Sequence, residues 1–173
     1  METETSDTFW RDYITEAMSF AVLKKTNPMA WLEACFGLLE ELGEVAGVFK
    51  RMARGDNGGK LDRDKLAKEL GDLLWYTVRI GYLSSDAGRV VMKMQAAFGM
   101  VYHEAQEHVP SDLHRLWWRM QSFLTDRSLS RFDIVRHIAD FAGLDLREVA
   151  TKNLVKLRAR KQVGTILGSG DDR

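Results

Sequence analysis

The sequence predicts an all-α fold in a single domain. Apolar residues recur at intervals of three and four along several segments, and no segment shows the strict alternation that is typical of a β-strand. The length of 173 residues suits one domain with its own core. Hydrophobic residues make up 45% and charged residues 29% of the chain, which is a globular composition. We therefore expect one helical domain over residues 1–173.

The two strongest helical patterns follow one another near the start of the chain. The first helix is expected to begin with Asn27 as N-cap and Pro28 in the first turn, and to end before the turn-forming segment 55–59. The second is expected to begin near Asp62 or Asp64 and to end or bend near residues 84–86. The expected buried faces are Trp31, Cys35, Leu38, Leu42, Val45 and Phe49 in the first helix, and Leu66, Leu70, Leu73, Thr77 and Ile80 in the second.

Four further helical segments are expected after these two. Amphipathic patterns cover residues 90–102, 113–124 and about 132–141, and the last of these ends at Gly143. Asp145 and Glu148 form a capping-box-like start for the final helix. The Gly-rich tail, residues 164–173, either folds over a ligand or frays.

The charge balance and the cysteine count exclude several classes of function. Lys+Arg and Asp+Glu both total 25, so no overall basic field attracts nucleic acid, and no direct nucleic-acid binding is expected. The single cysteine, Cys35, excludes an internal disulfide and is expected to be a buried thiol. No signal-peptide pattern and no run of about 18 uncharged apolar residues occurs, so we expect a cytoplasmic location and no membrane span.

Two pairs of acids lie at matched positions on the two strongest helices. Glu41 and Glu44 are three residues apart on the first helix, and Glu69 and Asp72 are three apart on the second. Residues at this spacing project from the same side of a helix. Each acid directly precedes an apolar residue of the expected buried face, so both pairs can meet at the edge of the core if those faces pack together. Carboxylate oxygens are ligands for Mg²⁺ or Mn²⁺. Solvated acids on two helix surfaces would give the same pattern.

Around these acids the sequence resembles the MazG-like, all-α nucleoside triphosphate pyrophosphohydrolases. Segments 37–46 and 68–76 match the family's ExxE and ExxD signature. Residues 153–158 resemble its N-x-x-K-L segment, and residues 168–173 resemble the Gly-Ser-Gly-Asp tail of some members. The four matches occur in the family's order along the chain.

The resemblance implies a MazG-like helical bundle, assembled as a homodimer or homotetramer. It implies Mg²⁺-dependent, or Mn²⁺-dependent, hydrolysis of an NTP or dNTP to the monophosphate and pyrophosphate, in housekeeping or control of the nucleotide pool. The acids Glu41, Glu44, Glu69 and Asp72 match the metal ligands and catalytic residues, and Asn153 and Lys156 match residues near the metal and the phosphates. Direct attack of water with a carboxylate as base requires neither a Walker A loop nor a Ser/His or Cys/His set, and neither is present.

Other substrate contacts are less well defined by the sequence. Phe20, Trp31 and Trp75 are candidates for stacking on a base, with buried packing as the alternative. Arg173 in the tail is a candidate substrate contact. The basic residues beside the turn between the two acidic helices, Lys50, Arg51, Arg54 and Lys60, either reach phosphates or are solvated.

One departure from compact members is the spacing of 81 residues between Asp72 and Asn153. We expect a helical insertion within residues 83–130 to account for it. This insertion allows an alternative in which the fold is a non-catalytic interaction module. A second alternative, a di-iron carboxylate bundle, normally uses Glu-x-x-His pairs, and this sequence contains none.

Overall fold

A computed structural model describes residues 6–84 and 131–165 of the chain, and these residues form helices connected by turns. The elements are α1 (Ser6–Ser19), α2 (Ala30–Ala53), the short 3₁₀ helix η1 (Asp56–Gly59), α3 (Arg63–Ser84), α7 (Arg131–Ala142) and α8 (Leu146–Gln162). No strand occurs within these ranges, so the all-α prediction is confirmed for them. The helices expected at 90–102 and 113–124, nearly all of the proposed insertion, and most of the tail lie outside the described residues.

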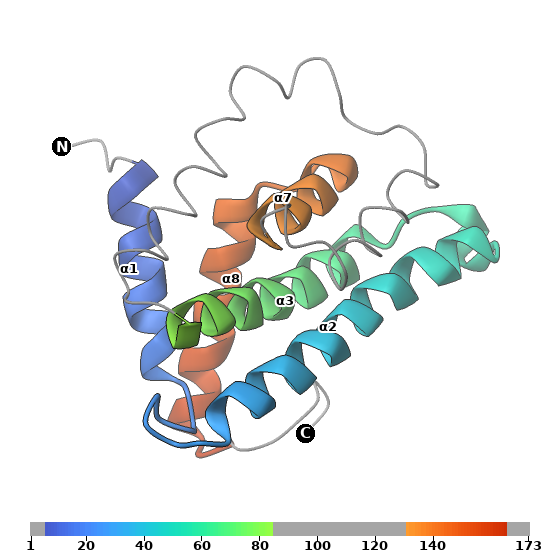
Figure 1. Cartoon of the computed structure of the whole chain (residues 1–173). Helices are drawn as coiled ribbons and strands as arrows, with labels where there is room; N and C mark the ends of the chain where they lie inside the picture. Colours follow the sequence, from blue (N-terminus) through green and yellow to red (C-terminus); the bar gives the residue numbers. More distant parts are fainter. Residues whose placement is uncertain (1–5, 85–130, 166–173) are drawn as a thin grey trace, which may run out of the picture.

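The two long helices α2 and α3 form an antiparallel hairpin (Figure 1). The turn between them contains η1, and Gly55 in it has a φ of 91°. At the start of α3, the Asp62 carboxylate accepts a hydrogen bond of 3.0 Å from the Lys65 N–H, which caps the free end of the helix. The expected turn at 55–59 and the expected start of the second helix are therefore both confirmed.

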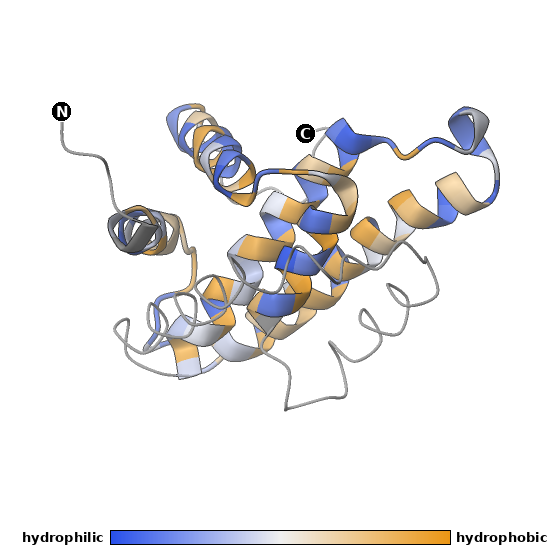
Figure 2. Cartoon of the chain, turned by 90° about the horizontal axis from the view of Figure 1, so that it is seen from above, coloured by the Kyte–Doolittle hydropathy of each residue, from blue (hydrophilic) through white to orange (hydrophobic). Residues whose placement is uncertain are grey.

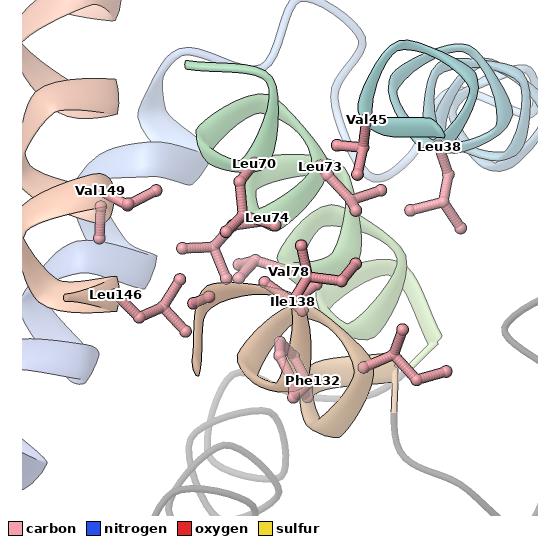
Figure 3. Close-up of a cluster of buried hydrophobic side chains, with 14 of the residues drawn as sticks. Leu38, Val45, Leu70, Leu73, Leu74, Val78, Phe132, Ile138, Leu146 and Val149 are labelled. Atoms are coloured by element: carbon pink, nitrogen blue, oxygen red, sulfur yellow. The ribbon is translucent and has the colours of Figure 1, made fainter. Parts of the chain in front are cut away.

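Helix α3 lies at the centre of the described helices and contacts α1, α2, α7 and α8. In Figure 3 its apolar side chains Leu70, Leu73, Leu74 and Val78 lie between α2 on one side and α8 on the other, with α7 against a third side. All five residues expected on the buried face of the second helix are in the interior. The two acids of the motif on α3 therefore lie on a helix that contacts both α2 and α8.

The prediction for the start of the first long helix is wrong by two residues, because α2 begins at Ala30 with Met29 as its N-cap. Asn27 does not cap α2, because its side chain accepts a hydrogen bond of 2.9 Å from the Met29 N–H and forms a turn ahead of the helix. Trp31 lies in the first turn of α2, where 46% of it is exposed, so it is not part of the buried face. The later members of that face, from Leu38 to Phe49, are buried as expected.

Helix α1 was not expected from the sequence, although it contributes a large part of the core. Trp10, Tyr13, Ile14 and Ala17 are all at most 2% exposed. Their spacing of three, one and three is one face of a helix and was the signal that could have found it. Helix α1 packs against α8 and α3, so it supports the same side of α3 that faces α8 (Figure 1).

The last two helices match the sequence predictions closely. Helix α7 ends at Ala142, directly before Gly143, and Asp145 caps α8 by accepting a hydrogen bond of 2.7 Å from the Arg147 N–H. Each helix in Figure 2 contains both hydrophobic and hydrophilic residues, which alternate every few positions. This pattern is typical of amphipathic helices around a shared core. Within the described ranges, no helix has the length and apolar character that crossing a membrane requires.

Candidate metal centre

Three carboxylates from the α2–α3 hairpin meet beside the core. One oxygen from each of Glu41, Glu69 and Asp72 lies within 4.8 Å of the others. Glu41 and Asp72 are partly buried, and Glu69 is only 2% exposed. Such a cluster offers only oxygen ligands, which suits a hard divalent cation such as Mg²⁺ or Mn²⁺. We refer to these three residues as the carboxylate cluster.

Glu44, the fourth acid of the sequence motif, lies at the edge of this cluster. It is exposed and is not among the acids whose oxygens converge within 4.8 Å. Its charge nevertheless contributes to raising the pKa of Glu41. The structure therefore brings three of the four expected ligands together, and a ligand role for Glu44 stays a prediction.

Helix α8 completes the site from the other side of α3. The Asn153 amide donates a hydrogen bond of 2.9 Å to one oxygen of Asp72, and the Lys156 ammonium forms an ion pair with the other oxygen. These residues are 81 and 84 positions after Asp72 in the chain. Both were expected near the metal and the phosphates, and the structure places both on a carboxylate of the cluster.

A close approach of α3 and α8 makes these contacts possible. Gly71 faces α8, and a Cβ atom at this position would lie 3.2 Å from Asn153 Cβ and 3.6 Å from the Val149 carbonyl oxygen. A larger side chain would hold the helices apart, because packed helix axes approach more closely when the contact residues are small. The small residue before the last acid of the motif thus sets the distance between Asp72 and Asn153.

Tyr13, on α1, contacts the side chain of Asn153. This buried side chain, which the sequence analysis did not identify, has its hydroxyl 3.5 Å from the side-chain oxygen of Asn153. A donated hydrogen bond to that oxygen fixes the orientation of the amide, so that its NH₂ group points to Asp72. Burial and the charge of Asp72 raise the pKa of Tyr13, so the phenol stays protonated and remains a donor.

The electrostatics of the cluster favour a bound cation. Three carboxylates and the Lys156 ammonium give the group a formal charge of −2. Burial, followed by the nearby charges of Asp72 and Glu44, raises the pKa of Glu41 to about 8. A carboxylate in this position either holds a proton near neutral pH or recruits a cation. The residues therefore fit a divalent metal in both ligand chemistry and charge.

A second glycine shapes the neighbouring surface of the cluster. A Cβ on Gly37 would lie 2.1 Å from a ring carbon of Tyr76, so the Tyr76 ring packs directly on the backbone of α2. Burial, together with the charges of Glu33 and Glu41, raises the pKa of Tyr76. No sequence motif marks Tyr76, since its role depends on the contact between the two helices.

The aromatic residues proposed for base stacking lie away from the carboxylate cluster or are held in the core. Trp31 is ten residues before Glu41 on the same helix, which corresponds to about 15 Å along its axis. The Trp75 indole N–H donates a hydrogen bond of 3.0 Å to the Ala17 carbonyl, and Phe20 is buried beneath Lys161. Arg173 lies outside the described residues. Of the basic residues beside the turn, Arg54 forms an ion pair with Asp56.

The described residues thus define an all-helical protein with a carboxylate cluster suited to a divalent cation. Residues 33–102 match the model of the MazG nucleotide pyrophosphohydrolase domain, so the MazG-like resemblance of the sequence motifs is confirmed for this part of the chain. The matched region includes α2 and α3 with all four acids, and it extends into the first part of the segment expected as an insertion.

The match to curated proteins is shorter. The Gene 37 protein of Mycobacterium phage L5 is 34% identical over 67 residues, which are 35% of this chain. The aligned part is 59% of the length of that phage protein. The comparison with solved structures gave no match. These findings establish the MazG-like segment and leave the reaction to be inferred from the site.

Proposed function

We propose that the protein is a nucleoside triphosphate pyrophosphohydrolase that uses Mg²⁺, or Mn²⁺, bound at the carboxylate cluster. The observation that carries the proposal is the convergence of Glu41, Glu69 and Asp72 within 4.8 Å in a segment that matches the MazG domain. The reaction would convert an NTP or dNTP and water to the monophosphate and pyrophosphate, as part of housekeeping or control of the nucleotide pool.

The residues of the chain have separate roles in this proposal. The cluster would hold the metal, which when bound would neutralise the phosphate charge and lower the pKa of a water ligand. Asn153 orients Asp72 through their hydrogen bond of 2.9 Å. Lys156, already at this carboxylate, supplies a positive charge to an incoming phosphate. A cluster carboxylate accepts the proton of the attacking water.

A screen for pyrophosphate release tests the proposal directly. The full chain is incubated with each common NTP and dNTP in the presence of Mg²⁺ or Mn²⁺, and pyrophosphate is measured. We expect turnover with at least one nucleotide, and its loss in Glu69→Gln and Asp72→Asn. Glu40→Gln is the matched control, because Glu40 is an exposed acid that directly precedes Glu41 on α2. Release from no nucleotide, or full activity of the cluster variants, would refute the proposal.

We also propose that the chain forms a homodimer or homotetramer. The outer side of the first half of α2 exposes Leu32, Phe36 and Leu39, whose exposed fractions are 44%, 63% and 48%. Their spacing of four and three makes one apolar helix face, which a subunit contact would cover. Light scattering coupled to size-exclusion chromatography should give a mass above 19.8 kDa, and Phe36→Glu should lower it. A monomeric mass for the unmodified chain would contradict the proposed assembly.

A further inference from the structure

Helix α1 carries none of the motif residues, yet one of its side chains is connected to the carboxylate cluster. The helix lies before residues 33–102, the part of the chain that matches the MazG domain. Tyr13, which is 1% exposed, has its hydroxyl 3.5 Å from the side-chain oxygen of Asn153. Asn153 in turn donates a hydrogen bond of 2.9 Å to Asp72. Side chains from α1, α8 and α3 thus form a chain of hydrogen bonds that ends on a carboxylate of the cluster.

The hydrogen bonds of this chain all run toward the carboxylate cluster. The phenol of Tyr13 donates, the amide of Asn153 accepts with its oxygen and donates with its nitrogen, and the Asp72 oxygen accepts. A rotation of the amide by half a turn would bring its oxygen against the carboxylate, so a donor at the other end of the amide fixes the productive orientation. Hydrogen bonds arranged head to tail in a buried site also polarise and strengthen one another.

The phenol and the amide stabilise Asp72 without adding a charge. The Lys156 ammonium pairs with the other oxygen of Asp72, and a divalent cation that enters the cluster repels this ammonium. Tyr13 and Asn153 are neutral, and burial raises the pKa of Tyr13, so the hydroxyl keeps the proton that it donates. Their hydrogen bonds can therefore hold Asp72 in the same orientation before and after a cation binds.

Contacts one turn further along α1 hold Tyr13 in place. Its hydrogen bond of 3.5 Å is long for a hydroxyl donor, so the bond depends on how closely α1 packs against α8 (Figure 1). The Glu16 carboxylate accepts two hydrogen bonds of 2.5 and 2.6 Å from Arg158 on α8. The Trp75 indole N–H donates a hydrogen bond of 3.0 Å to the Ala17 carbonyl, which attaches the same part of α1 to α3. The position of the phenol is therefore fixed from two helices.

We infer that Tyr13 is a positioning residue of the metal centre, which acts through Asn153 to hold Asp72 in the orientation that binds the cation. The inference rests on the proposed function, because it assigns α1 to the same site. A tyrosine with a role in packing alone would contribute through its ring, whose centroid lies 5.9 Å from that of Trp10 in the core. The hydroxyl and the ring therefore have to be tested separately.

Tyr13→Phe removes the hydroxyl and keeps the buried ring. The full chain is titrated with Mn²⁺ in a calorimeter, and we expect the Kd to rise by about tenfold in the variant, the lower end of what outer hydrogen bonds contribute to metal sites. Tyr82→Phe is the control, because it removes a phenol ten residues after Asp72 on α3, about 15 Å along the helix, and should leave the Kd unchanged. An unchanged Kd in Tyr13→Phe, or an equal rise in both variants, would overturn the inference.

A double-mutant cycle determines whether Tyr13 acts through Asn153. Asn153→Ala alone should raise the Kd for Mn²⁺ by at least about tenfold. Adding Tyr13→Phe to Asn153→Ala should cause no further rise, because the phenol then has no amide to orient. Urea denaturation in a chelator gives a readout without metal, in which Tyr13→Phe should lower the midpoint less in the Asn153→Ala background than in the unmodified chain. Additive changes in the Kd or in the midpoint would overturn the inference.

The failure of this inference can be distinguished from the failure of the proposed function. If the unmodified chain binds no Mn²⁺ and releases no pyrophosphate, the proposed function fails, and the role of Tyr13 in metal binding fails with it. If the unmodified chain binds Mn²⁺ and hydrolyses a nucleotide while Tyr13→Phe keeps the same Mn²⁺ affinity, the proposed function holds and only the assignment of Tyr13 fails.

Discussion

The substitution Gly71→Ala tests the close approach of α3 and α8 on which the site depends. The added Cβ would lie 3.2 Å from Asn153 Cβ and 3.4 Å from the Asn153 amide nitrogen. The distance to the Asn153 Cβ is shorter than an ordinary van der Waals contact. Replacing glycine within a helix normally stabilises the protein by about 1 kcal/mol. Overpacking at a tight contact costs about 1–3 kcal/mol. We therefore expect a net loss of about 0–2 kcal/mol in the free energy of unfolding.

The matched control is Gly43→Ala on α2. Gly43 lies in the same helical hairpin, and a Cβ there has no neighbour within 4 Å, so this variant should gain about 1 kcal/mol. Urea denaturation measures both changes, and a difference of about 1–3 kcal/mol corresponds to a separation of about 1 M between the two midpoints. Displacement of Asn153 from Asp72 should also weaken Mn²⁺ binding by about tenfold in Gly71→Ala alone.

Two results would refute this reasoning. Stabilisation by Gly71→Ala equal to that by Gly43→Ala would mean that the helix contact does not require glycine. Unchanged Mn²⁺ affinity in a destabilised Gly71→Ala would mean that Asn153 does not position Asp72.

Three further predictions concern the hairpin and its charges. Gly37→Ala should lower the free energy of unfolding, measured by urea denaturation, by about 3 kcal/mol, because the new Cβ displaces the Tyr76 ring. Adding Tyr76→Leu should recover part of this loss, and no recovery would contradict the contact. The pKa of Glu41 is about 8 in the folded chain, compared with an ordinary value of 4.5. At a pH between these two values, the folded chain should carry a proton on Glu41, and a bound metal ion should displace this proton. The affinity for Mn²⁺ should therefore rise as the pH rises from 6 to about 8. In a chelator, the free energy of unfolding should fall over the same pH range, since the folded chain binds more protons than the unfolded one. Calorimetry in two buffers measures the first effect and urea denaturation the second, and equal Mn²⁺ affinity at both ends of the range would contradict the prediction. Arg79→Met should lose about 2–3 kcal/mol in the free energy of unfolding, because this buried side chain bonds a backbone carbonyl and lies 3.9 Å from a carboxylate of α2. The comparison variant Arg158→Met removes an exposed ion pair and should lose much less, so similar losses would contradict the role of burial.

The sequence predicted the secondary structure of the site well, because helical periodicity and caps are local. The buried face of α3 from Leu66 to Ile80 and the cap of α8 at Asp145 follow from residues within a few positions of one another. The start of α2 was missed for a local reason as well, since the side chain of Asn27 forms a turn that competes with capping. Helix α1 was missed although its apolar spacing was present.

The sequence alone thus determined that two pairs of acids flank two apolar helix faces, and the MazG-like motifs marked these acids, Asn153 and Lys156 as the candidate site residues. Only the tertiary structure decided that Glu41, Glu69 and Asp72 converge while Glu44 stays exposed. The reason is that the distance between side chains on two helices depends on how the helices cross and how far one is shifted along the other, and neither quantity is contained in the period of a single helix. The same holds for Asn153 and Lys156, which reach Asp72 across 81 and 84 residues because α8 packs closely against a glycine of α3.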